Sequence, residues 1–196
     1  MSRFTRSRGK ILLHLDNTEL ELFTRSVNEL LDLLDDGAVE QAEPDDGDDP
    51  FAMWERSFGT QPGIEDDLPD DERDPITERM FPSAYPDDPE AASDFARFTE
   101  AAQRSAKIAD ACTVLDDLDS LRGGTTRIAP DHIDAWLKTL NNLRLALSVV
   151  LGISDEVSNH EAAQRPDEDP RAWLYTYYGW LGWMLESLLE SVMAPE

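Results

Sequence analysis

The sequence predicts a mainly α, bundle-like single domain with a small N-terminal β element, and three observations lead to this fold class. First, two aromatic and leucine-rich segments, residues 136–147 and 173–189, repeat apolar residues with the period of an α-helix. Second, the Asp-Pro pairs at residues 74–75, 88–89 and 169–170 are typical of helix N-termini. Third, a chain of 196 residues is long enough to bury a core and suits one domain, residues 1–196.

The N-terminal segment, residues 2–15, predicts a hairpin or strand pair. Gly9 would supply the turn, and Ile11, Leu13 and Leu15 alternate with other residues as in a strand with one buried face. The first helix is predicted to follow directly.

This first helix is predicted to begin at a capping box formed by Thr18 and Glu21. It is predicted to end near Gly37. Between these points apolar residues recur at helical spacing: Leu20, Phe23, Val27, Leu30, Leu31 and Leu34.

An acidic segment, residues 38–73, differs from the rest in composition. It is rich in aspartate and proline and holds too little apolar surface to offset the entropy of ordering the chain. We therefore expect a largely disordered insert. One aromatic island, residues 51–58, either docks on the main core or folds on a partner.

The second half predicts three long helices. The first runs from about residue 88 to 121, the second from 130 to Gly152, and the third from 169 to about 192. A short extended piece is predicted at residues 125–129.

Arg144 is predicted to be a buried charge. Projection of its helix at about 100° per residue places it near the centre of the apolar stripe. A guanidinium cannot lose its charge there, so we expect a buried ion pair between Arg144 and Asp116, with Glu186 or Glu190 as substitutes.

Cys112, the single cysteine, excludes an intramolecular disulfide. Projection of its helix along Phe95, Phe98, Ala102 and Ala109 places Cys112 on the inner side. The residue is expected to be a small inert hydrophobe that reacts slowly with thiol reagents, and it is also the one redox candidate the chain offers.

Basic residues gather at one place in an otherwise acidic chain: Arg3, Arg6, Arg8 and Lys10. This cluster either protects an edge strand against aggregation or contacts an acidic protein or DNA phosphate. The net charge of −25 argues against broad coating of nucleic acid.

The motifs of several function classes are missing from the sequence. It shows no phosphate loop, nucleophile elbow or metalloprotease motif, and its one cysteine and three scattered histidines do not form a zinc-binding pattern. No apolar stretch has the length of a membrane span or signal peptide. We expect a cytoplasmic protein that is not an enzyme and needs no cofactor or metal.

Several blocks together resemble one family. They are Phe4-Thr-Arg-Ser-Arg-Gly, Arg79-Met-Phe-Pro-Ser-Ala-Tyr, Trp136-Leu-Lys-Thr-Leu-Asn-Asn-Leu-Arg and Tyr178-Gly-Trp-Leu-Gly-Trp-Met. The chain resembles the actinobacterial family long catalogued as a domain of unknown function and more recently called AosR-like oxidative-stress transcription regulators.

The resemblance implies a regulator of redox-stress genes that works through a protein partner such as a sigma factor, or through DNA. The residues alone leave a second function open, a helical scaffold or adaptor that forms homo-oligomers through its C-terminal aromatic helix without binding DNA. Light scattering separates these two functions.

Overall fold

A computed structural model describes residues 3–35, 74–84, 89–121 and 124–194. It confirms the predicted mainly α fold with a small antiparallel sheet. The proposed insert at residues 38–73 and its aromatic island lie outside the described residues.

The predicted N-terminal hairpin is confirmed, and the extended piece predicted at residues 125–129 forms a third strand beside it. Strands β1 (Arg3–Ser7) and β2 (Lys10–His14) pair antiparallel, and β2 also pairs with β3 (Thr125–Ile128). The order is β1-β2-β3. Phe4, Ile11, Leu13 and Ile128 are buried on one face, as the period-2 alternation requires.

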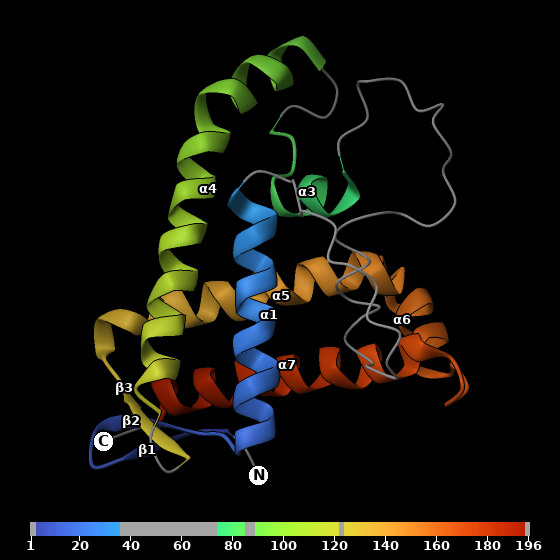
Figure 1. The fold of residues 1–196 in the computed structure, drawn as a ribbon. Coiled ribbons are helices and arrows are strands. Elements are labelled where there is room, and N and C mark those ends of the chain that lie inside the picture. Colours follow the sequence, from blue (N-terminus) through green and yellow to red (C-terminus); the bar gives the residue numbers. More distant parts are fainter. Residues whose placement is uncertain (1–2, 36–73, 85–88, 122–123, 195–196) are drawn as a thin grey trace.

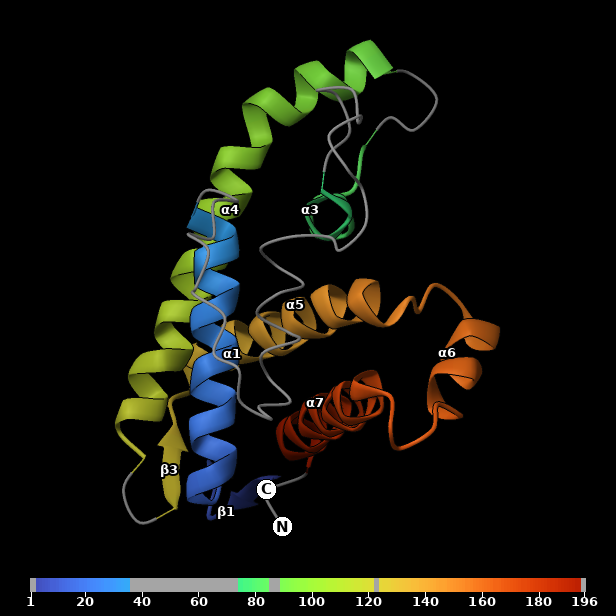
Figure 2. The same ribbon diagram turned by 45° about the vertical axis from the view of Figure 1, so that its right-hand side comes forward.

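The helices form two antiparallel pairs that cross each other (Figures 1 and 2). Helix α1 (Asn17–Asp35) lies beside α4 (Pro89–Asp119), and α5 (Ile133–Leu151) lies beside α7 (Pro170–Met193). The short helices are α3 (Pro75–Met80), the 3-10 turn η1 (Pro130–His132) and α6 (Glu156–Ala163).

The helix ends follow from local hydrogen bonding. Asp74 and Asp169 cap α3 and α7, as predicted, by accepting bonds from the backbone N–H groups of Thr77 and Arg171. Gly152 ends α5 in a left-handed conformation. The capping box of α1 is formed by Asp16 and Glu19, whose carboxylates each accept the other's backbone N–H. The predicted box of Thr18 and Glu21 is therefore wrong by two residues.

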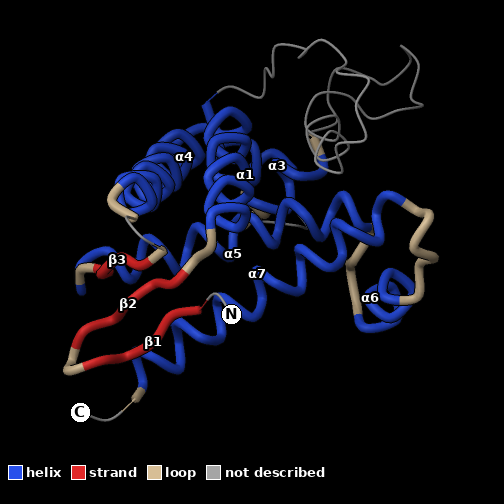
Figure 3. The backbone as a smooth tube through the Cα atoms, turned by 60° about the horizontal axis from the view of Figure 1, so that its bottom comes forward, coloured by secondary structure: helices blue, strands red, loops and turns tan. Residues whose placement is uncertain are grey.

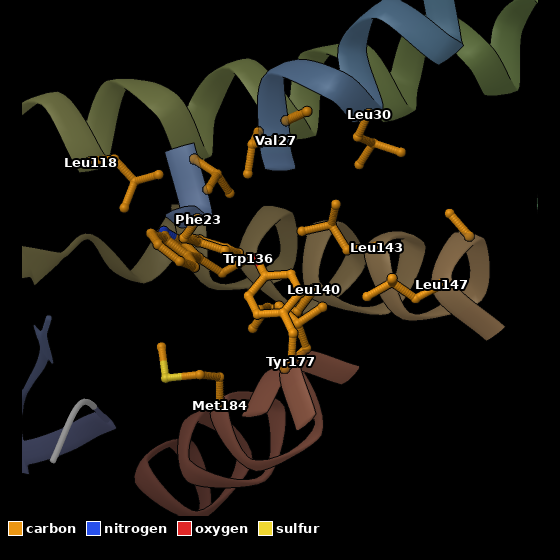
Figure 4. Packing of buried hydrophobic residues seen from close by; sticks show 14 of the residues in the cluster. Phe23, Val27, Leu30, Leu118, Trp136, Leu140, Leu143, Leu147, Tyr177 and Met184 are labelled. Atoms are coloured by element: carbon orange, nitrogen blue, oxygen red, sulfur yellow. The ribbon is translucent and has the colours of Figure 1, made fainter. Parts of the chain in front are cut away.

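The core lies where the two helix pairs cross, and Trp136 lies at its centre (Figure 4). The fully buried Trp136 ring stacks on Phe23 at 5.7 Å and meets the edge of Phe4 at 5.3 Å. This one indole thus joins α5, α1 and β1. Strand β1 lies against the C-terminal half of α7 (Figure 3). There Phe4 N–H donates to Ser187 Oγ at 3.2 Å.

Candidate partner-binding site

The outer face of the sheet is a basic surface, which we call the basic face. The strand register places Arg3, Ser7, Lys10, Thr125 and Arg127 on the face opposite the buried Phe4 and Ile128, and all five are exposed. Arg8 adds a fourth cation at the turn, where its φ of 51° is left-handed. None of the three strands contains an Asp or Glu.

A polar network crosses the basic face at one end of the sheet, where β1 and β3 begin and β2 ends. His14 Nε2 lies 3.0 Å from Thr5 Oγ1, and His14 Nδ1 lies 3.0 Å from Thr125 Oγ1. The three residues stand on three neighbouring strands, so the imidazole links the whole sheet.

Arg6 was predicted as a partner contact together with Arg3, Arg8 and Lys10, and the structure separates it from them. It lies on the other face of β1, where its Nη1 donates to the backbone carbonyls of Ala194 at 2.8 Å and Val192 at 3.3 Å. Arg6 thus satisfies free carbonyls at the end of α7. Its positive charge also interacts favourably with the negative end of the α7 dipole.

Arg127 is a member of the basic face that the sequence analysis missed. It is opposite Leu12 in the β2–β3 register, more than a hundred positions away along the chain. The segment Thr125–Ile128 alternates between exposed and more buried residues, which is typical of a strand. Nothing in the sequence indicated that this strand pairs with β2.

The predicted ion pair between Arg144 and Asp116 is not formed, because Asp116 is exposed on α4. Arg144 is half-buried and lies over the Tyr178 ring, 4.8 Å from Cζ to the ring centroid. Its Nη2 donates to Tyr178 Oη at 3.2 Å. The substitutes Glu186 and Glu190 are also exposed, and in the described part of the chain neither forms an ion pair with Arg144.

Cys112 is exposed, so its predicted burial is wrong. The buried side of α4 includes Ala111, Val114 and Leu118. Ala111 follows Ala109 by two residues, or about 200° around the helix, so the predicted stripe was on the opposite side. Phe95 and Phe98, which set that prediction, are 40% and 81% exposed.

A family model, described as Domain of unknown function (DUF2017), matches residues 1–192. The chain belongs to this family. No curated protein and no solved structure matches it. The residues that match the DUF2017 model include the sheet, the crossing helix pairs and the basic face.

Among the described residues of this DUF2017 member, no helix is both long and apolar enough to cross a membrane.

Proposed function

We infer that the protein is a non-enzymatic regulatory protein that binds an acidic protein partner through the basic face. The observation that carries this proposal is the gathering of Arg3, Lys10 and Arg127 on strands without a carboxylate, with Arg8 at the turn between β1 and β2, in a chain of net charge −25. Local positive potential on an acidic molecule favours one docking orientation.

The extent of the basic face favours a protein over DNA. A duplex is a long polyanion that extends past the short strands, and a chain of net charge −25 repels such a polyanion more than it repels a short acidic segment. At physiological salt, charges are screened beyond about 8–10 Å. An acidic helix or loop of a partner protein that contacts only the sheet is therefore repelled little by the rest of the chain.

The resemblance to AosR-like oxidative-stress transcription regulators supports the same proposal. Regulation through a protein partner such as a sigma factor requires a recognition surface and no catalytic site. Under this proposal the protein works in the cytoplasm, and direct DNA contact is the runner-up use of the basic face.

The test compares two pairs of substitutions that remove equal charge. Lys10→Gln with Arg127→Gln alters the basic face, whereas Arg79→Gln with Lys138→Gln removes two exposed cations elsewhere. Partners are captured from a lysate of the native organism, identified by mass spectrometry, and their affinities are measured with purified proteins at several salt concentrations.

We expect the basic-face variant to lose affinity and salt dependence for the partner, and the control variant to bind as the wild type does. Equal binding by all three proteins contradicts the proposal. Tight binding of a mixed-sequence DNA duplex that only the basic-face variant loses would assign the surface to DNA.

A second function, self-association, is favoured by exposed apolar residues at the end of α7. Leu189, Val192 and Met193 are 41%, 38% and 81% exposed. An apolar patch of this kind is typical of interfaces. Met193→Asp would convert a concentration-dependent dimer into a monomer in light scattering, and a wild type that is monomeric at micromolar concentration excludes the scaffold.

A further inference from the structure

A second candidate site lies away from the basic face, in an open cavity of about 520 Å³ between α5, α6 and α7 with α3 at its side. Its walls include Arg144 and Asn141 from α5, Asn159 from α6, Tyr175 and Tyr178 from α7, and Arg79 from α3. Tyr178 is thirteen residues before Ser191 on α7, or about 20 Å along the helix, so the cavity and the sheet are separate surfaces.

Arg144 is held in this cavity with most of its hydrogen-bonding capacity unused. A guanidinium has five N–H donors, and Arg144 uses one of them, to Tyr178 Oη, within the described structure. Its Nε is buried without an acceptor and lies 3.5 Å from the position of a Cβ on Gly182. The guanidinium thus lies between the Tyr178 ring and Gly182. The second N–H of Nη2 and both N–H groups of Nη1 are left for a ligand.

The carboxylates of the cavity do not neutralise Arg144. Asp155 accepts bonds from the backbone N–H and the hydroxyl of Ser158, at 2.8 and 2.7 Å. These bonds, the backbone one first, lower the pKa of Asp155. Glu156 is exposed. A charge that cannot be lost, and that forms no ion pair with the described residues, is a feature that attracts an anionic ligand.

Tyr178 supplies a second donor beside the first. Its hydroxyl oxygen accepts the bond from Arg144 Nη2, so its own O–H is available to another acceptor. Two donors whose heavy atoms are 3.2 Å apart suit the two oxygens of one planar carboxylate. Leu145, Ile153 and the Tyr175 ring offer apolar contacts to the body of such a ligand.

We propose that this cavity binds a small apolar monocarboxylate, with its carboxylate on Arg144 and Tyr178. The formal charges of the lining Arg79, Arg144, Asp155 and Glu156 cancel, and the whole chain is strongly acidic. A monoanion therefore fits better than a doubly charged phosphate. The proposal does not depend on the function of the basic face.

The test uses three probes that share a phenyl ring: benzoate, phenyl phosphate and the neutral benzamide. Binding is measured by calorimetry and by the NMR signal of the Arg144 Nε–H group. We expect benzoate to bind at millimolar concentration and to shift that signal, with weaker binding of phenyl phosphate and none of benzamide. Absence of benzoate binding, or equal binding of benzamide, overturns the proposal, and tighter phenyl phosphate overturns the choice of carboxylate.

Variants then assign the contacts. Arg144→Gln and Tyr178→Phe should each weaken benzoate binding by about tenfold or more, since a hydrogen bond to a charged group is lost. Lys138→Gln, an exposed cation outside the cavity, should bind benzoate as the wild type does. Because Tyr178→Phe removes one oxygen atom, it keeps the test decisive if Arg144→Gln does not fold. Wild-type affinity in both contact variants overturns the site.

Discussion

The indole nitrogen of Trp136 donates a 2.8 Å hydrogen bond to Asp117 Oδ2, and this bond joins the first turn of α5 to the end of α4. His132 Nδ1 lies 3.1 Å from both oxygens of the same carboxylate. Asp117 is 9% exposed, so a nearly buried carboxylate accepts the Trp136 N–H and lies within hydrogen-bonding distance of the His132 ring. Trp136, the largest fully buried side chain among the described residues, thereby also has its polar atom satisfied.

Replacement of Asp117 by alanine should lower the free energy of unfolding by about 2–3 kcal/mol, because the buried Trp136 N–H would lose its acceptor. Asp116→Ala is the matched control, since this neighbouring aspartate is exposed. Urea denaturation of the two variants measures the difference. Equal stabilities would show that the Trp136–Asp117 bond contributes little.

The sequence predicted the existence of the long helices better than it predicted their buried sides. Asp74, Asp169 and Gly152 mark helix ends through local bonds that a short segment determines. The buried side depends on what packs against a helix. On α5, Leu143 is completely buried and Arg144 follows it by about 100°, which places Arg144 at the border of the core.

In the candidate sites, too, the features that depend on a short segment were predicted and those that depend on distant residues were not. The exposed cations of β1 and β2 were found as a sequence cluster, whereas Arg127 joins them through long-range strand pairing that the sequence does not encode locally. Helix α6 was missed because it has only eight residues. The Asp155–Ser158 capping box was its available signal, and without α6 the Arg144 cavity could not be predicted.

Tyr177 should make stability depend on pH in the alkaline range. Burial raises the pKa of its hydroxyl above 10, although a bond with Ser26 Oγ at 2.7 Å opposes the shift. The native state therefore keeps a proton that the unfolded chain loses, so this contribution is complete below about pH 10 and is lost as pH rises further.

Comparison with Tyr177→Phe isolates this contribution. The substitution should lower the free energy of unfolding by only about 1 kcal/mol at neutral pH, because Ser26 Oγ keeps a partner in Leu22 O. Above about pH 10 its stability should fall less steeply than that of the wild type. Chemical denaturation across this range measures both slopes, and parallel curves would contradict the assignment to Tyr177.

Two glycines with similar backbone conformations should respond differently to alanine. Gly124 and Gly152 have φ values of 79° and 70°, and each would cost about 1–2 kcal/mol as alanine from the left-handed backbone alone. A Cβ at Gly124 would also lie 3.1 Å from Leu15 O, whereas a Cβ at Gly152 has nothing within 4 Å. The Leu15 N–H bond to Gly124 O, at 3.1 Å, prevents the loop from moving away freely.

We therefore expect Gly124→Ala to lower the melting temperature more than Gly152→Ala. Calorimetry of both variants in one buffer provides the measurement. The same loss in each would mean that the loop before β3 moves aside at little cost.

Cys112 should react quickly with thiol reagents in the native state, because its side chain is exposed on α4. The reagent should be neutral, such as iodoacetamide, since Asp110 and Asp116 lie near it in the helix and would repel an anionic one. Mass spectrometry should show alkylation of the folded protein at a rate close to that of the urea-denatured chain. Native labelling much slower than denatured labelling would show that Cys112 is covered.

The redox role of Cys112 is a separate prediction. A peroxide-induced dimer that reductant reverses, and that the Cys112→Ser variant does not form, would support this role.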